Sequence, residues 1–194
     1  MAKIITVPSP ILRKKSTPVE KLDKKTLKLI SDLKVTLTRQ ADPEGVGISA
    51  PQIGVNKRVF VIKTTNSKQQ TTKNYPITQL PNYIIVINPE IIEFSKDTNY
   101  DHLKPADRYY EGCLSIPEIY GEVKRPWTIK ATYQTPDQIT QLRNSTITQL
   151  SGFDAIYFQH EYDHLNGILF TDRILEQGGK MFRQNKAGEF EPLQ

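Results

Sequence analysis

The sequence has little cysteine, little histidine and no long apolar run, and each shortage narrows the class of protein. Among 194 residues there are one cysteine and three histidines. A single cysteine cannot form an intramolecular disulfide, which argues against a small disulfide-stabilised secreted scaffold. No stretch approaches the roughly 20 apolar residues that a membrane-spanning helix requires, so we expect no membrane insertion. The length suits one domain over residues 1–194, ending in a polar tail from about residue 178.

The chain also lacks the marks of a targeting segment. Residues 1–8 have neither the apolar stretch of a secretory signal nor the composition of a transit peptide. We therefore expect a cytoplasmic protein, or an organellar matrix protein if a presequence was removed. The formal net charge is +5, but the basic residues are scattered. Short clusters such as 13–15 and 21–25 have no aromatic residues between them, so no specific nucleic-acid binding is predicted.

Hydrophobic periodicity predicts a helix near the N-terminus and several strands after it. Apolar residues recur at helical spacing from Leu27 to Leu37, so an amphipathic helix is expected over Lys24–Gln40, with Asp23 as its N-cap. Four runs are rich in residues that favour strands: Arg58–Ile62, Tyr83–Ile87, Trp127–Tyr133 and Asn144–Leu150. The polar segment Thr64–Pro81 is expected to be a long exposed loop.

A second helix is predicted over Ser151–Leu165. Ser151 and Asp154 have the spacing of a capping box, in which a hydroxyl and a carboxylate satisfy free amides of the first helical turn. Asn166 and Gly167 follow the last apolar position and are typical of a helix end. This helix contains an unusual group of polar residues.

That group is the pentad His160-Glu161-Tyr162-Asp163-His164, which has the H-E-x-x-H pattern. Residues four apart lie one turn apart on the same helix face, so both imidazoles can point at one ion. Glu161 lies about 100° around the helix from His160, where its carboxylate can reach a water molecule beside the ion. Two of the three histidines fall at this spacing around a glutamate, which favours a metal site over chance histidines.

Two histidines leave a tetrahedral ion short of one protein ligand. Glu176, Glu189 and Glu191 are possible carboxylate ligands, but none lies in a recognisable metal-binding sequence. Cys113 is the better candidate, because a lone cysteine in a reducing compartment is a buried hydrophobe, a reactive thiol or a metal ligand. The metal site predicted on the helix favours the last interpretation. Glu111, two residues earlier, is either a partner of a metal ligand or a plain surface carboxylate.

Three motifs occur in order along the chain after a short N-terminal segment. They are Gly45–Gln52 (G-x-G-x-S-A-x-Q), Glu111–Ser115 (E-G-C-L-S) and His160–His164 (H-E-x-D-H), and the N-terminal segment is Pro10–Arg13 (P-x-L-R). In this order they resemble the peptide deformylase family, in which Leu and Ala usually stand where this chain has Ile48 and Ser49. The resemblance extends from about Ile4 to Arg173, and three ordered motifs are far more specific than one.

The resemblance implies an α+β fold, with small mixed or antiparallel β-sheets surrounding a central helix that carries H-E-x-D-H, plus the N-terminal amphipathic helix. It implies a hydrolase that removes the formyl group from the N-terminal formyl-methionine of newly synthesised polypeptides and releases formate. By similarity, Cys113, His160 and His164 bind one divalent ion, and Glu161 moves the protons. The expected ion is Fe²⁺, with nickel, cobalt or zinc as substitutes.

The resemblance also assigns roles around the metal. The Gln52 side-chain amide and the Leu114 backbone N–H would stabilise the negative charge that grows on the formyl oxygen. The main chain of Val46 and Gly47 would bind the peptide, since glycine lets a loop approach a substrate closely. The expected partners are formyl-methionyl nascent peptides and, transiently, the ribosome. The expected oligomeric state is a monomer.

Two other functions fit parts of the same pattern. Another metallo-amidase or peptidase could use the same Cys/His/His site, and it would cleave peptides with a free amino terminus while leaving formyl-methionyl peptides intact. A non-catalytic basic protein could keep the metal for stability and bind RNA in a salt-sensitive way. The ordered set of motifs favours the deformylase.

Overall fold

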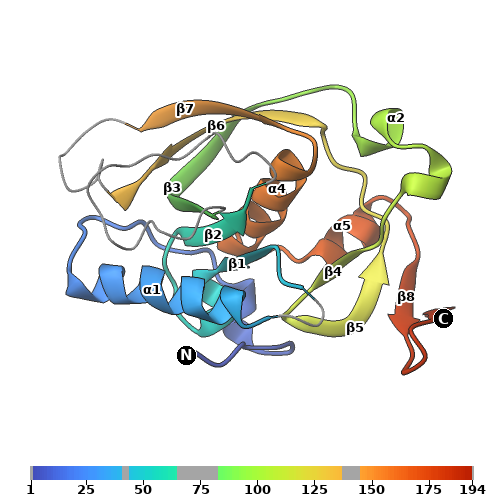
Figure 1. The fold of residues 1–194 in the computed structure, drawn as a ribbon, viewed down its shortest axis with the longest axis horizontal. Helices are drawn as coiled ribbons and strands as arrows, with labels where there is room; N and C mark the ends of the chain where they lie inside the picture. Colours follow the sequence, from blue (N-terminus) through green and yellow to red (C-terminus); the bar gives the residue numbers. More distant parts are fainter. Residues whose placement is uncertain (1, 41–43, 65–82, 137–144, 194) are drawn as a thin grey trace.

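In a computed structural model, described for residues 2–40, 44–64, 83–136 and 145–193, two antiparallel sheets pack with helices beside them (Figure 1). The larger sheet has the order β1-β2-β3-β6-β7, with strands Gly47–Ser49, Val59–Lys63, Tyr83–Phe94, Thr128–Gln134 and Thr146–Ser151. The smaller sheet has the order β4-β5-β8-β9, with strands Glu111–Cys113, Ile116–Gly121, Met181–Gln184 and Phe190–Pro192. The predicted α+β class with antiparallel sheets is confirmed.

The helices lie on both faces of the larger sheet. The α-helices of the described residues are α1 (Lys24–Thr38), α2 (Asn99–His102), α4 (Phe153–Leu165) and α5 (Phe170–Glu176), and the 3-10 helices are η1 (Pro10–Arg13), η2 (Ala50–Ile53) and η4 (Pro105–Asp107). Buried residues of α1 and α4 belong to two separate apolar clusters on opposite faces of β2 and β3. No helix in the described part of the chain could span a bilayer.

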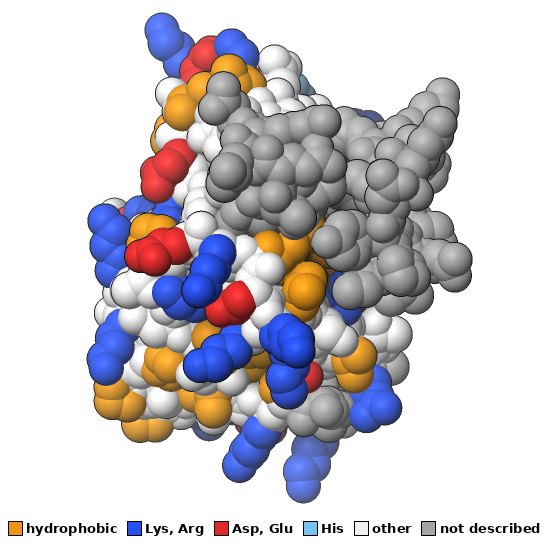
Figure 2. All heavy atoms as spheres, turned by 90° about the vertical axis from the view of Figure 1, so that its left-hand side faces the viewer, with side chains coloured by type: hydrophobic (Ala, Val, Ile, Leu, Met, Phe, Trp, Pro, Cys, Tyr) orange, Lys and Arg blue, Asp and Glu red, His pale blue; other side chains and the backbone are white. Residues whose placement is uncertain are grey.

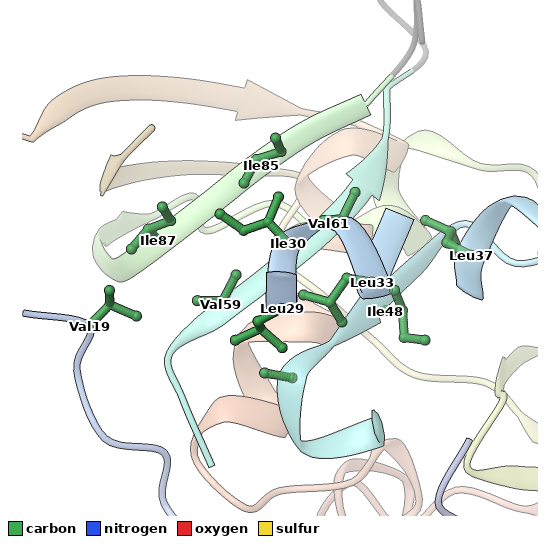
Figure 3. Packing of buried hydrophobic residues seen from close by; sticks show 11 residues of the cluster. Val19, Leu29, Ile30, Leu33, Leu37, Ile48, Val59, Val61, Ile85 and Ile87 are labelled. Atoms are coloured by element: carbon green, nitrogen blue, oxygen red, sulfur yellow. The ribbon is translucent and has the colours of Figure 1, made fainter. Parts of the chain in front are cut away.

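Strand β2 is buried on both faces, which explains its unbroken apolar sequence. Val59 and Val61 belong to the cluster that includes α1, whereas Phe60 and Ile62 belong to the cluster that includes α4. Successive side chains of a strand point to opposite faces, so each face receives every second residue. Figure 3 shows the α1 side, where Ile30 and Leu33 of α1 lie near Val59 and Val61 of β2.

Packing of α1 on this sheet predicts a large cost for shortening a buried side chain. Leu33 is 0% exposed, whereas Val35 on the same helix is 38% exposed. We expect Leu33→Ala to lower the free energy of unfolding by about 3 kcal/mol, since it removes buried methyl groups and leaves a cavity. The matched control, Val35→Ala, is expected to change it by less than about 0.5 kcal/mol. Urea unfolding midpoints measure both, and equal losses would contradict the assigned helix faces.

Several predicted element boundaries differ from those observed. Helix α1 ends at Thr38 rather than Gln40, and Asp23 accepts a hydrogen bond from the Thr26 backbone amide at 2.8 Å, as expected for its N-cap. Strand β3 continues past the predicted end at Ile87 to Phe94, through a register shift at the bulge that begins after Ile87. The segment predicted as the long loop, Thr64–Pro81, lies outside the described residues except for its first residue.

The C-terminal tail adds two strands to the smaller sheet. Strand β8 pairs with β5, and β9 pairs with β8, so the tail forms a hairpin at the edge of that sheet. The sequence predicted only a polar tail without a strong helix. Lys and Arg side chains are spread over the face in Figure 2, with Asp and Glu side chains among them, as expected for scattered, solvated charges.

Candidate metal centre

Helix α4 brings His160 and His164 to the same side, with ring centroids 5.0 Å apart. The capping box predicted at Ser151 is wrong. The helix begins at Phe153 after Gly152, whose φ of 65° favours glycine, and no side chain caps it. Ser151 is instead the last residue of β7 and pairs with Thr128 of β6. The helix therefore starts at a glycine turn out of the sheet.

Cys113, at the end of β4, reaches the two histidines. Its Sγ atom lies 3.2 Å from Nε2 of His164. One donor atom from each of Cys113, His160 and His164 lies within 4.8 Å of the other two, and no other such group is found among the described residues. A thiolate and two imidazoles at this separation suit a divalent transition metal. None of the three carboxylates considered as alternatives, Glu176, Glu189 and Glu191, belongs to this cluster.

Glu111 is a buried partner of His160 and not a surface carboxylate. Its Oε1 atom lies 2.6 Å from Nδ1 of His160, and its side chain is 6% exposed. Arg125 donates two hydrogen bonds to this carboxylate, at 2.8 and 2.7 Å. Burial opposes ionisation, but the Arg125 charge and the His160 contact hold the pKa of Glu111 well below its usual value. Nδ1 of His160 is thus occupied, which leaves Nε2 for the metal cluster.

A buried ion-pair network continues behind the cluster of Cys113, His160 and His164. Arg125 also donates to Asp163 of α4 at 3.0 Å, and Asp163 accepts from Arg173 of α5 at 2.7 Å. The Asn99 side chain accepts from the Arg125 backbone amide at 3.0 Å and is buried. The sequence analysis did not single out Arg125 or Asn99. Both belong to ordinary-looking polar stretches, and only burial distinguishes them.

Glu161 faces the same space from α4. It is 3% exposed, and its Oε2 atom has no hydrogen-bond partner within the described residues. Burial raises the pKa of Glu161 to about 7. A Cβ atom on Gly47 would lie 2.5 Å from Oε1 of Glu161, so a side chain at position 47 would displace this carboxylate, which the sequence did not reveal. The carboxylate thus has one free oxygen and a pKa suited to proton transfer near neutral pH.

The Gln52 side chain is held with its NH₂ group toward the cysteine. Its Oε1 atom accepts hydrogen bonds from the Ser49 backbone amide and hydroxyl, both at 2.8 Å. Its Nε2 atom lies 3.4 Å from the Cys113 sulfur. Ser49, one of the two departures from the family motif, therefore helps to orient Gln52. The amide has its donor end directed at the metal cluster.

A cavity of about 470 Å³ opens beside these residues. Its lining includes every residue predicted for the site apart from His164: Val46, Gly47, Gln52, Cys113, Leu114, His160 and Glu161. His164 is 1% exposed and lies behind the cavity wall. A cluster of three side chains able to bind a metal, a buried glutamate and an open cavity are together typical of a metal-dependent hydrolase.

Comparison with known proteins defines the class further. The family model for polypeptide deformylase matches residues 1–179. Peptide deformylase from Agrobacterium fabrum is 36% identical over 171 residues, covering 88% of this chain and 85% of that protein. Peptide deformylase from Halothermothrix orenii is 36% identical over 179 residues, covering 92% of this chain and 97% of that protein.

Solved structures give the same result. The crystal structure of peptide deformylase from Thermotoga maritima matches with a TM-score of 0.66 at 34% identity, covering 89% of this chain and 97% of that chain. A probable peptide deformylase from Synechococcus phage S-SSM7 matches with a TM-score of 0.69 at 33% identity, covering 89% and 99%. The chain belongs to the polypeptide deformylase family, whose members are metal-dependent hydrolases.

Proposed function

We propose that this chain removes the N-formyl group from the N-terminal formyl-methionine of newly synthesised polypeptides. Water adds to the formyl carbon, the C–N bond breaks, and formate and a free amine are released. The observation that carries the proposal is the approach of one thiol and two imidazoles to within 4.8 Å beside an open cavity, in a chain of the polypeptide deformylase family.

Cys113, His160 and His164 would hold one divalent ion, with Fe²⁺ as the native metal and nickel, cobalt or zinc as substitutes. The thiolate donor suits a soft ferrous site, and the donor set of the described residues fits such an ion. When bound, the ion supplies Lewis acidity, which lowers the pKa of a water molecule and polarises a carbonyl oxygen. Glu111 orients His160 through their 2.6 Å contact.

Glu161 is the proton carrier in this proposal. Its free Oε2 atom and its pKa of about 7 suit a group that accepts a proton from water and later donates it to the departing amine. Gln52 Nε2–H and the Leu114 backbone N–H are the proposed donors to the formyl oxygen, where negative charge develops. Such a donor contributes roughly 3 kcal/mol to the stabilisation of the transition state.

The peptide backbone would bind beside β1. This strand is at an edge of the larger sheet, because it pairs only with β2 in the described residues. A free edge offers unpaired N–H and C=O groups to an extended peptide, as in binding by strand addition. Val46 and Gly47, which line the cavity, are the proposed peptide-binding residues.

The remaining parts of the proposal concern the whole chain. We take residues 1–194 as one catalytic domain in which α4 is the central scaffold, and we expect a monomer acting in the cytoplasm or an organellar matrix. A transient ribosome contact would bring the enzyme to nascent chains. The described tail forms a β-hairpin.

Formate release from formyl-Met-Ala-Ser tests the function directly. Anaerobically purified, iron-loaded protein is expected to release one formate per peptide, and a chelator-treated sample is expected to release none. Cys113→Ser is expected to lower both the metal content and the activity, because it replaces the soft ligand. Zinc-loaded protein is the control for metal identity. Cleavage of free-amine peptides with formyl peptides left intact would instead favour another metallo-amidase.

A further inference from the structure

The cavity has an aromatic wall that the C-terminal hairpin helps to build. Tyr110 and Tyr120 line the cavity, and Phe190 of β9 packs edge-on against both rings, with centroids 4.9 and 5.3 Å away. Phe182 of β8 stacks on Tyr110 at 4.7 Å. Strands β8 and β9 lie beyond residue 179, where the match to the family model ends. Phe182 and Phe190 therefore lie outside the residues that the family model matches.

Tyr120 connects the aromatic wall to the metal cluster. Gly112, which precedes Cys113, is paired with Tyr120 in the β4–β5 ladder. A Cβ atom on Gly112 would lie 2.6 Å from Cε1 of Tyr120, so the ring lies directly against the Gly112 backbone. A peptide whose formyl group reacts at the cluster can therefore extend its next side chains past the Tyr120 ring.

Glu118 adds an uncompensated negative charge to the same cavity. Among the described residues that line it, there are four glutamates and no lysine or arginine. Glu44 and Glu111 each pair with a basic side chain at 2.7 Å, and Glu161 is buried beside the metal cluster. Glu118 is exposed and makes no ion pair or hydrogen bond within the described residues. It is the carboxylate left to interact with a ligand.

The backbone of Glu118 has an unusual conformation. Its φ is 66°, in the left-handed region that side chains other than glycine rarely adopt. Strained conformations of this kind are often retained at binding and catalytic sites. The partner strand β8 contributes Gln184 to the same cavity, whereas its exposed Arg183, paired with Ile119, does not line it. Gln184 is thus the only residue of the hairpin among the described lining residues, so no cation of the hairpin lines the cavity.

We propose that Glu118 and the Tyr120 ring select substrates with a lysine or arginine in the two or three residues after formyl-methionine. The inference rests on the proposed deformylase function and names its preferred substrate class. The carboxylate attracts the cationic head group, and the face of a tyrosine ring attracts it as well. The aliphatic stem of lysine or arginine can lie along the aromatic wall. Because Glu118 is exposed, the preference is modest and weakens with salt.

Matched peptides test this preference. We expect kcat/KM for formyl-Met-Ala-Lys or formyl-Met-Lys-Ala to exceed that of the corresponding Glu peptide by about 5-fold at low salt, which corresponds to roughly 1 kcal/mol. Glu118→Gln should bring the Lys/Glu ratio close to unity, and Glu118→Lys should invert it. Glu118→Gly removes the charge while keeping the backbone conformation, so it controls for strain. The control Glu20→Gln makes the same charge change at an exposed residue outside the cavity and should leave the ratio unchanged.

Two measurements separate failure of this inference from failure of the proposed function. If formate is released and Glu118→Gln leaves the Lys/Glu ratio of kcat/KM unchanged, the selectivity is overturned and the deformylase function stands. The same conclusion follows if Glu20→Gln lowers this ratio as much as Glu118→Gln does. Calorimetry with the unformylated peptides Met-Ala-Lys and Met-Ala-Glu gives the same ratio without catalysis. If Met-Ala-Lys binds more tightly than Met-Ala-Glu only when Glu118 is present, and no formate is released from any peptide, the selectivity is supported and the deformylase function is overturned.

Discussion

Glu161→Gln is expected to lower kcat for formate release by about 10²–10⁴-fold, the range for loss of a general acid–base group. The metal content should not change, because the glutamine would lie in the same buried position beside the ligands without being one of them. Glu161 has a free Oε2 atom and a pKa of about 7, and an amide can neither accept nor return the proton. Formate assays and metal analysis on the same samples measure both effects.

The same substitution should change how stability depends on pH. Burial raises the pKa of Glu161 from 4.5 to about 7, so the folded protein binds a proton that the unfolded chain releases between these values. Wild-type stability therefore falls as pH rises through this window, and the glutamine variant lacks that loss. With a chelator present, the variant should gain stability relative to wild type between pH 5 and pH 8.

Two outcomes for Glu161→Gln would contradict the proton-carrier role. One is unchanged turnover, and the other is loss of metal together with loss of turnover.

Arg125→Met is expected to lower the free energy of unfolding by about 3–5 kcal/mol, because it leaves buried carboxylates without their counter-ion. Arg125 is 4% exposed and bridges Glu111 and Asp163. Its loss should also weaken metal binding, since Glu111 would no longer be fixed against His160. Chemical denaturation and competition with a chelator measure the two effects.

Two further variants separate charge from geometry at this position. Arg125→Lys keeps the positive charge but loses the paired hydrogen bonds to Glu111, so an intermediate loss is expected. Arg13→Met removes an exposed arginine that pairs with Asp172, and it should cost less than about 1 kcal/mol. Equal losses for Arg125→Met and Arg13→Met would show that burial of the network adds nothing.

Local sequence patterns predicted those features that depend on neighbours along the chain. Helix spacing alone put His160 and His164 on one face, because residues four apart are separated by one turn in any α-helix. The same reasoning gave the start of α1 at Lys24 and its cap at Asp23. Propensity also predicted Ser151 as a cap, but pairing of Ser151 with Thr128 in the sheet prevailed over it.

Burial could not be derived from these local patterns. Asn99 and Arg125 occur in polar stretches that resemble exposed loops, and both are less than 5% exposed. The two-sided burial of β2 was likewise unpredicted, since a short apolar run does not tell which helix covers which face. The close approach of position 47 to Glu161 likewise joins residues that lie far apart in sequence.

The sequence by itself determined the donor types and the pair of histidines on one helix face, since residue identity and helical periodicity are local properties. Motif order then indicated Cys113 as the third donor. Only the tertiary structure decided that its sulfur lies 3.2 Å from a histidine 51 residues away, and that Arg125 neutralises Glu111 behind the ligands. Distances between remote residues and the exclusion of water from their charges follow from the packing of both sheets and α4, which no single segment specifies.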